Sequence, residues 1–365
     1  MKTSSYEQKT SAETTKKRNK GAVFMHSAIT AAACAVMLVF SSCMPDVPAG
    51  TNNPKDEEES NALQPEISEA DADGKFTIAI LPDTQQEVIG ESAIENELFL
   101  NRTEWLAENK EELDLRFVIH TGDIVNWGNE EPEQFEIASE AIAVLDEADI
   151  PVGLCLGNHD TAAVGVGGSA ADPDNTKTRV RDTETFNEYF SLDRYPDCIP
   201  FEDDKIDNAY QFFEAGGKEW LILTLELWPR GDVIAWANRI VEMHSDKNVI
   251  VATHSYLTSS GELMQSNGGY GATSPQYLYD TFISKHENIK LVFCGHNGTS
   301  AVREDFGESG EKIVSLLGCY HSSDKNPVQI VEIDVNEGTI SSRVFTPIDG
   351  GEWTDHAYTV DGLEF

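Results

Sequence analysis

Five apolar, strand-like runs in this chain each end in a short polar cluster built from Asp, Asn, His or Gln. The clusters are Pro82-Asp83-Thr84-Gln85, Gly122-Asp123-Ile124-Val125-Asn126, Gly157-Asn158-His159-Asp160, Thr253-His254-Ser255 and Gly295-His296-Asn297. Strands of an α/β sheet deliver their loops to one edge, and ligands bind at that edge. Five such loops meeting at one point would gather carboxylate and amide oxygens with imidazoles, which is a ligand set for a pair of divalent metal ions.

The order of the predicted elements is that of an α/β fold. The first three strands are predicted at 75–81, 115–120 and 152–156, with helices between them at about 91–112 and from Pro132 to Leu145. Apolar residues in the second helix recur at helical spacing. This β-α-β-α-β succession predicts parallel strands joined by right-handed crossovers.

The rest of the chain alternates between loop-rich pieces and further elements. Residues 161–208 begin with several glycines and continue polar, which predicts an insertion over the rim of the site. A second loop-rich piece covers 258–273. The remaining predicted elements are a hairpin of 210–213 with 220–225, helices at 232–244 and from Ser274-Pro275, and strands at 248–252, 290–294, 313–318, 328–335 and 339–345.

The charge of the chain argues against a nucleic acid partner. Its 365 residues hold 26 basic and 64 acidic side chains, for a formal net charge of −38. Nucleic acid binding needs a cationic face, so we expect none. An anionic substrate would have to be attracted by the local charge of bound metal ions rather than by the field of the whole protein.

The N-terminal residues carry the parts of an export signal. Basic residues at 16–20 precede an apolar stretch at 21–40, and small residues lead to Cys43 as in a bacterial lipobox. We therefore predict an export signal over 1–43 with Cys43 lipidated; the alternative is an uncleaved membrane anchor. Residues 44–75 read as an acidic, solvated tether, and 76–365 as the folded domain. Either reading predicts a membrane-anchored protein of the bacterial cell envelope, held to the membrane by its anchor alone.

Taken together, the polar clusters resemble the pattern of the calcineurin-like metallophosphoesterases. That pattern is Asp-x-His, Gly-Asp, Gly-Asn-His-Asp/Glu, a His at a strand end, and Gly-His-x-His. The resemblance covers roughly 76–345, and its most specific part is Gly-Asn-His-Asp at 157–160 in register with Gly-Asp at 122–123. It implies a four-layer α/β/β/α sandwich, which the alternating elements allow.

The resemblance also implies roles for individual residues. Asp123 would bridge two metal ions, Asp83 and Gln85 would belong to the first site, and the second site would be completed by Asn158, His254 and His296. His159 would protonate or stabilise the leaving oxygen, and Asp160 would orient His159. Two divalent ions, whether Mn, Fe, Zn, Mg or Ca, would activate a water and clamp the phosphoryl oxygens.

Two positions depart from the family pattern, and both affect the first metal site. Gln85 stands where the family has His, and Gly298 stands where Gly-His-x-His has its second His. An amide oxygen is a harder and weaker ligand than imidazole, so we expect the first site to prefer Mn, Mg or Ca over Zn, or to bind loosely. His321 could replace a missing ligand, although a histidine on a surface loop is the more common reading.

Several other residues have two readings each. Arg230 could grip a phosphate or form a surface ion pair. Asn126 is expected beside the metal ligands, where it is a second candidate for contact with the substrate, and His120 is expected to be a core or supporting histidine. The aromatic residues Trp127, Tyr256 and Tyr270 either line a substrate cleft or pack. Among the cysteines, 155 and 294 are expected to be buried thiols, and a bridge between 198 and 319 is left open.

The sequence thus predicts metal-dependent hydrolysis of a phosphate mono- or diester by an exported, membrane-tethered enzyme. The substrate would be a phosphorylated small molecule or a surface glycan. The rival is a degenerate relative that holds one metal ion and binds a phosphorylated or glycan ligand without turnover. Retention of His159 and Asp160 favours the enzyme, because binding alone needs no proton donor, whereas Gln85 and Gly298 favour the rival.

Overall fold

The computed structural model of the chain describes residues 73–89, 93–271, 273–321 and 324–365. The predicted export signal, the lipidated Cys43 and nearly all of the predicted tether lie outside the described residues. Among the described helices, none combines the length and the apolar character that crossing a membrane requires.

The first of two sheets contains the N-terminal parallel strands that the sequence predicts. Parallel pairs join β1 to β2 and β2 to β3, and antiparallel pairs extend the sheet from β1 through β11 to β12. Its strands are β1 (Lys75–Leu81), β2 (Leu115–His120), β3 (Val152–Leu154), β11 (Val328–Asp334), β12 (Thr339–Thr346), β13 (Gly351–Glu352) and β14 (Tyr358–Val360). The order is β13-β12-β11-β1-β2-β3, with β14 also paired to β12.

The second sheet is also mixed. Its central strands β6, β7, β8 and β10 are parallel to one another, and antiparallel strands flank them on both sides. Its members are β4 (Ile199–Pro200), β5 (Ala209–Ala215), β6 (Lys218–Leu225), β7 (Asn248–Thr253), β8 (Ile289–Cys294), β9 (Ser300–Phe306) and β10 (Lys312–Gly318). The order is β4-β5-β6-β7-β8-β10-β9.

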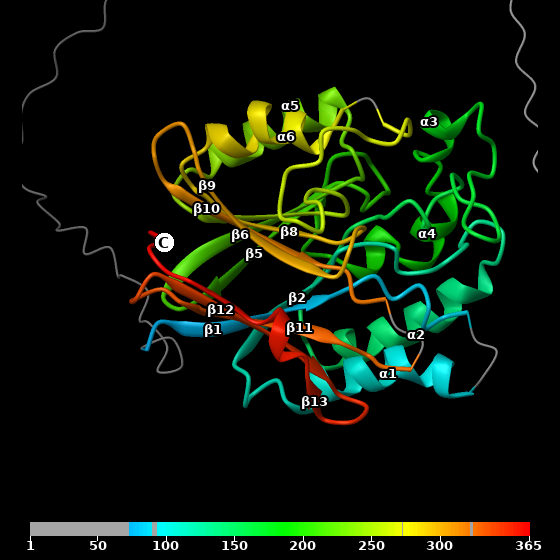
Figure 1. The fold of residues 1–365 in the computed structure, drawn as a ribbon, viewed down its shortest axis with the longest axis horizontal. Helices are drawn as coiled ribbons and strands as arrows, with labels where there is room; N and C mark the ends of the chain where they lie inside the picture. The colour runs from blue at the N-terminus through cyan, green and yellow to red at the C-terminus, as the bar shows by residue number, and fades with distance from the viewer. Residues whose placement is uncertain (1–72, 90–92, 272, 322–323) are drawn as a thin grey trace, which may run out of the picture. The chain divides into compact units, whose positions relative to one another are not determined.

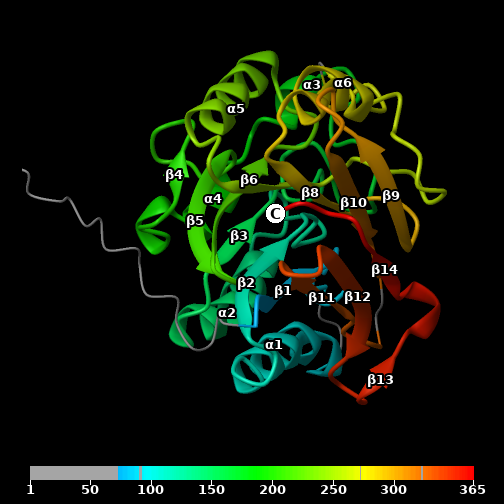
Figure 2. The same ribbon diagram turned by 90° about the vertical axis from the view of Figure 1, so that its left-hand side faces the viewer.

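The two sheets pack face to face between two layers of helices, as Figures 1 and 2 show. Apolar side chains of both sheets, such as Ile78 of β1 and Ile250 of β7, form the central core. A second core lies between the first sheet and α1 (Ala93–Glu108) and α2 (Glu133–Glu147), and a third between the second sheet and α5 (Gly231–Met243) and α6 (Pro275–Thr281). The predicted four-layer α/β/β/α sandwich is confirmed.

The sequence reading missed four strands and gave a few wrong ends. β4, β13 and β14 have two or three residues each, and β9 is an edge strand with several half-exposed positions, so none shows a long apolar run. The third strand ends at Leu154 rather than at 156, because only its first residues pair with β2.

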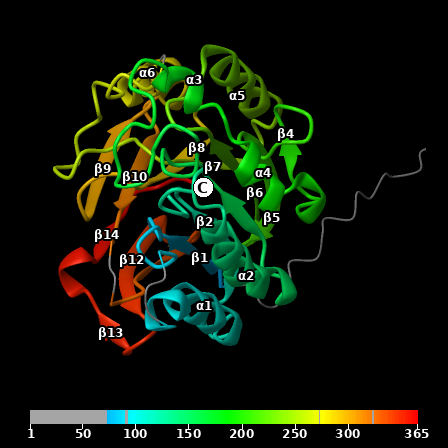
Figure 3. The same ribbon diagram turned by 90° about the vertical axis from the view of Figure 1, so that its right-hand side faces the viewer.

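The segment 161–208 carries more structure than a rim loop. It includes α3 (Thr176–Arg179) and α4 (Glu184–Tyr189), which Figure 3 shows from the side on which they lie. Phe186 and Phe190 are buried against Phe135 of α2, with ring centroids 6.1 and 6.2 Å from it. Part of this segment therefore belongs to the core of the first sheet.

Candidate metal centre

The five polar clusters follow β1, β2, β3, β7 and β8, at the carboxyl ends of these strands. Glycines let the loops approach one another closely. A Cβ at Gly157 would lie 2.0 Å from Asp123 Oδ1, and one at Gly295 would lie 2.2 Å from Asp83 Oδ1. Only glycine leaves room for the two carboxylates at these points, so the Gly-Asn-His-Asp and Gly-His motifs need their first residue for close packing.

Three side chains predicted for the second metal site lie within bonding reach of one another. Asp123 Oδ2 is 3.1 Å from His254 Nε2, and His254 Nε2 is 3.1 Å from His296 Nδ1. Asp123 and His296 have φ angles of 50° and 73°, which is a left-handed backbone conformation that residues other than glycine seldom adopt. Such backbone conformations concentrate at functional sites, where the surrounding structure holds them in place.

His254 is oriented by the main chain. Its Nδ1 lies 2.9 Å from the carbonyl oxygen of Thr121, so Nδ1 donates and Nε2 faces Asp123. Burial by itself would lower the pKa of His254, but the carboxylates of Asp123 and Asp83 raise it to about 9. Burial and the neighbouring His254 lower the pKa of His296 to about 4. In the absence of metal, a protonated His254 thus supplies a positive charge that offsets the negative charges of the buried Asp123 and Asp83 carboxylates.

Two amide oxygens at the centre have no hydrogen-bond partner among the described residues. They are Asn158 Oδ1 and Gln85 Oε1, and both are buried. The Gln85 amide nitrogen donates to Asp123 Oδ2 over 3.4 Å, which leaves its oxygen free. Because an unpaired buried acceptor is costly, these oxygens fit a role as ligands of a cation. The sequence predicted one of them for each metal site.

A second group of possible ligands surrounds Asp83, whose side chain is buried. His321 Nε2 and Cys319 Sγ each lie 3.3 Å from Asp83 Oδ2. From the sequence, metal ligation by His321 is the less common of two alternatives, and Cys319 is considered only for a disulfide bridge with Cys198. The structure places both beside Asp83, at the end of β10, and the only signal in the sequence was a polar residue shortly after a predicted strand.

The His159 ring is held by the main chain and not by Asp160. Its Nδ1 lies 2.6 Å from the carbonyl oxygen of Asn126, and its backbone N–H donates to Asp123 Oδ1 over 3.0 Å. The Asp160 carboxylate instead accepts hydrogen bonds from the N–H groups of Val125, at 3.0 Å, and Gly157, at 2.8 Å. The prediction that Asp160 orients His159 is corrected: Asp160 ties two loops together.

The two residues predicted to bind substrate have other contacts. Arg230 pairs with Glu202 over 2.9 Å and with Glu226 over 3.0 Å, which matches the ion-pair reading. Asn126 is buried and contributes its carbonyl oxygen to His159. In the structure, Asn126 therefore holds the His159 ring in place, and Arg230 forms ion pairs with Glu202 and Glu226.

Further residues at the centre support or enclose it. His120 is buried and lies 3.0 Å from Thr84 Oγ1, as expected of a supporting histidine. Tyr256 is fully buried, so it packs rather than lining a cleft. The ring of Trp228, which the sequence reading passed over, lies edge-on to His296 at 5.8 Å and beside Tyr270 at 5.7 Å. These two aromatic rings form an apolar wall next to the second site.

The described cysteines are all free thiols. They are Cys155, Cys198, Cys294 and Cys319, and each is buried. The expectation for Cys155 and Cys294 is thus confirmed, and the open question of a 198–319 bridge is answered, because no bond joins them.

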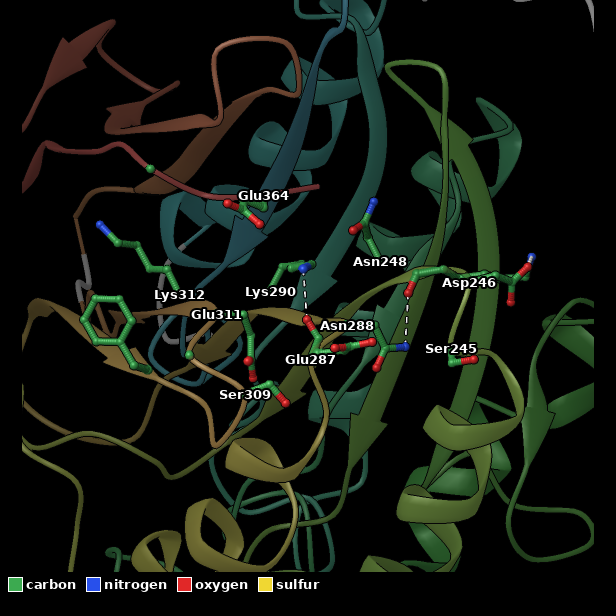
Figure 4. Close-up of a pocket in the computed structure, with 14 residues that line it drawn as sticks. Ser245, Asp246, Asn248, Glu287, Asn288, Lys290, Ser309, Glu311, Lys312 and Glu364 are labelled. Carbon is green, nitrogen blue, oxygen red and sulfur yellow. Dashed lines mark hydrogen bonds and ion pairs between the residues drawn. The ribbon is translucent and has the colours of Figure 1, made fainter.

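A cavity of about 610 Å³ lies at the other edge of the second sheet and is shown in Figure 4. Asn248, Lys290 and Lys312, at the starts of β7, β8 and β10, line it together with Glu311 and Glu364. The metal-centre residues follow the opposite ends of the same strands. The cavity carries charges of both signs and contains none of the predicted site residues.

Comparisons with known proteins agree with the motif pattern. Residues 76–298 match the calcineurin-like phosphoesterase family. A curated relative, the uncharacterised protein YvnB of Bacillus subtilis, is 26% identical over 212 residues, which is 57% of this chain and 14% of that protein. The chain thus spans about a seventh of the length of the curated relative it matches.

Two solved structures are similar at low identity. A dimetal phosphatase from Danio rerio is 12% identical with a TM-score of 0.45, over 78% of this chain and 98% of that one. A conserved uncharacterised protein of Streptococcus pneumoniae is 12% identical with a TM-score of 0.31, over 79% and 98%. The family match covers more than half of the sequence, and the motifs that carry it follow the carboxyl ends of strands in both sheets of the fold that the family implies: the chain belongs to the calcineurin-like phosphoesterase family.

Proposed function

We propose that the protein hydrolyses phosphate mono- or diesters at a centre of two divalent metal ions. The observation that carries this proposal is the meeting of two groups of ligand side chains, one around Asp123 and one around Asp83, within one loop cluster. The buried and unpartnered oxygens of Asn158 and Gln85 fit the same role. Membership of the phosphoesterase family supports the reaction class.

The protein's own residues would divide the work as follows. Asp123, Asn158, His254 and His296 would hold one ion, and Asp83 with Gln85 would belong to the other. Two bound divalent ions supply an activated water and neutralise the phosphoryl oxygens. His159, fixed through Nδ1 by the Asn126 carbonyl, presents its other ring nitrogen as a proton donor for the leaving oxygen.

The buried carboxylate of Asp160 keeps the two loops that carry these groups in register. It bonds the backbone of Val125, in the loop after β2, and of Gly157, in the loop after β3. Asp123 and His159 are members of those loops. Asp160 is therefore a positioning residue in this proposal.

The test is turnover of a generic aryl phosphate monoester and of the matching diester, with Mn²⁺ supplied. Protein stripped by a chelator should be inactive and should recover when Mn²⁺ is returned. Asp123→Asn protein purified in parallel guards against a contaminating phosphatase. The ratio of monoester to diester rates identifies the ester class. Absence of turnover with both esters, in protein that retains metal, would favour the single-metal binding protein instead.

The natural substrate we propose is a phosphorylated small molecule or a surface glycan. This proposal is supported by the predicted export of the protein and not by a feature of its pocket: the N-terminal sequence has the parts of an export signal followed by Cys43. The strongly acidic composition gives nucleic acid no cationic face to bind.

We also propose that the protein is anchored at the cell envelope through a lipid on Cys43. Cys43→Ser is expected to release the body from membranes, because a doubly acylated cysteine supplies the two chains that stable anchoring needs. The measurement is the distribution of the protein between membrane and soluble fractions, with Cys34→Ser as the matched control. A full-length Cys43→Ser variant that still sediments with membranes would mean that residues 21–40 form an uncleaved anchor.

A further inference from the structure

Three donor atoms of different chemistry converge on one point beside the predicted first metal site. Asp83 Oδ2 lies 3.3 Å from Cys319 Sγ and 3.3 Å from His321 Nε2, and these last two atoms are 3.7 Å apart. The Asp83 side chain is fully enclosed, Cys319 is buried, and His321 is partly exposed. A carboxylate, a thiol and an imidazole gathered in this way are a set of donors that could hold a metal ion.

Strand order explains why residues so distant in sequence meet. β8 pairs in parallel with β10, so the loops that follow the two strands leave the sheet side by side. His296 follows β8 and donates its backbone N–H to Asp83 Oδ2 over 3.1 Å, while Cys319 and His321 follow β10 and approach the same oxygen. The chain thus brings a sixth strand end to the metal centre, beyond the five with polar clusters.

The position that the family pattern reserves for an imidazole has no space for one. A Cβ at Gly298 would lie 2.4 Å from Ser259 Cβ and 3.0 Å from Ser259 Cα, and φ at Gly298 is 68°. Both the backbone conformation and the neighbouring loop oppose a side chain there. The loss at position 298 is therefore fixed by the fold, and within the described part of the chain the imidazole that reaches the Asp83 carboxylate is that of His321.

We propose that Cys319 and His321 are ligands of the first metal ion, together with Asp83 and with the side-chain amide oxygen (Oε1) of Gln85. This deepens the proposed function and rests on it for the existence of that ion. A thiolate and an imidazole change the expected metal preference. The site should select Zn²⁺, Co²⁺ or Fe²⁺ rather than Mg²⁺ or Ca²⁺. This preference differs from that of a hard, loosely binding site, which is expected when Gln85 and Gly298 alone are considered.

The competing explanation is a hydrogen-bonded trio that holds no ion, with the Cys319 thiol donating to Asp83. The two explanations differ in the state of the sulfur when metal is supplied. An ion bound by Cys319 displaces the thiol proton and forms a metal–sulfur bond. A thiol that only donates a hydrogen bond forms no bond to an added ion and adds no charge-transfer band to the absorption spectrum of that ion.

The experiment is reconstitution of the metal-free full-length protein with Co²⁺, followed by absorption spectroscopy and metal counting. The wild type is expected to bind two ions per chain and to show a near-ultraviolet thiolate-to-cobalt charge-transfer band. Cys319→Ser should lose the band. His321→Ala should lower the binding affinity for one of the two ions by at least ~10–100-fold, because the loss of even a supporting residue of a metal site has an effect of this size. Competition with Zn²⁺ and Mg²⁺ then measures the preference.

Matched controls separate ligation from general damage. Cys198→Ser removes another buried free thiol, and His244→Ala removes a histidine at the end of α5; both should keep the band and both ions. Circular dichroism shows whether each variant is folded. A wild type without the band, or a band that survives in folded Cys319→Ser, would overturn the proposal. A wild type with the band but no ester hydrolysis would reject the proposed function and leave the ligand assignment in place.

Discussion

His159→Ala is expected to lower the turnover number by ~10²–10⁴-fold, the usual contribution of a positioned acid or base, and to leave two metal ions bound per chain. His159 lies next to the metal centre, because its backbone N–H donates to Asp123 Oδ1. Its side chain nevertheless belongs to neither group of possible metal ligands. Removing the ring therefore removes a proton donor and no ligand. Metal counting alongside steady-state kinetics measures both quantities.

The dependence on leaving group makes this prediction sharper. An acid that protonates the leaving oxygen matters most when that oxygen is strongly basic, so the loss should be larger for an alkyl ester than for a nitrophenyl ester. Equal losses with both esters, or loss of metal with activity, would mean that His159 is not the acid. His244→Ala is the control for histidine replacement away from the centre.

The second site could be predicted from the sequence because each of its ligands directly follows a strand with an apolar run. His254 and His296 follow the neighbouring parallel strands β7 and β8 of the second sheet, whereas Asp123 follows β2 of the first sheet. The strand ends therefore identified the ligands, but the meeting of Asp123 with the two histidines also depends on the packing of the two sheets against each other. Their left-handed conformations, at Asp123 and His296, appeared only in the structure.

The first site could not be completed in this way. Cys319 and His321 follow a strand whose end shows no cluster of metal-ligand type, and their approach to Asp83 depends on β10 lying next to β8. Strand order is not readable from periodicity. The clash between position 298 and Ser259 likewise depends on where a loop folds back, which local sequence does not encode. Asp160 was misassigned because its partners are backbone N–H groups, which every residue of those loops offers.

The loop that carries Asp83 and Gln85 is fixed by a buried ion pair between Glu87 and Arg102 of α1. The two side chains are 1% and 0% exposed, and Arg102 Nε also donates to the carbonyl oxygen of Asn326 over 3.2 Å. Replacing one partner of such a pair leaves a buried charge without compensation. Arg102→Met is therefore expected to lower the free energy of unfolding by ~3–5 kcal/mol, measured by urea denaturation.

The double variant Glu87→Leu with Arg102→Met should recover most of this loss, because an apolar pair of similar volume often replaces a buried ion pair without cost. Arg343→Met, which breaks the exposed pair with Glu352, is the control and should change the free energy of unfolding by less than ~1 kcal/mol. If the single and double variants were equally unstable, packing of the Arg102 stem rather than its charge would be the cause.

The loss in Arg102→Met should also depend on pH in a defined direction. Burial raises the pKa of the Glu87 carboxyl from an ordinary 4.5 to about 7, with Arg102 opposing the shift, so removing Arg102 raises it further. A carboxyl whose pKa is higher in the folded state favours folding when protonated. Its contribution is complete below the unfolded pKa and is lost as pH rises through the folded pKa. Because the wild-type carboxyl itself titrates at about 7, the deficit of Arg102→Met should grow as pH rises above about 7 and should be smallest below that pH; a deficit that is the same at acidic and alkaline pH would show that Glu87 is not the group left uncompensated.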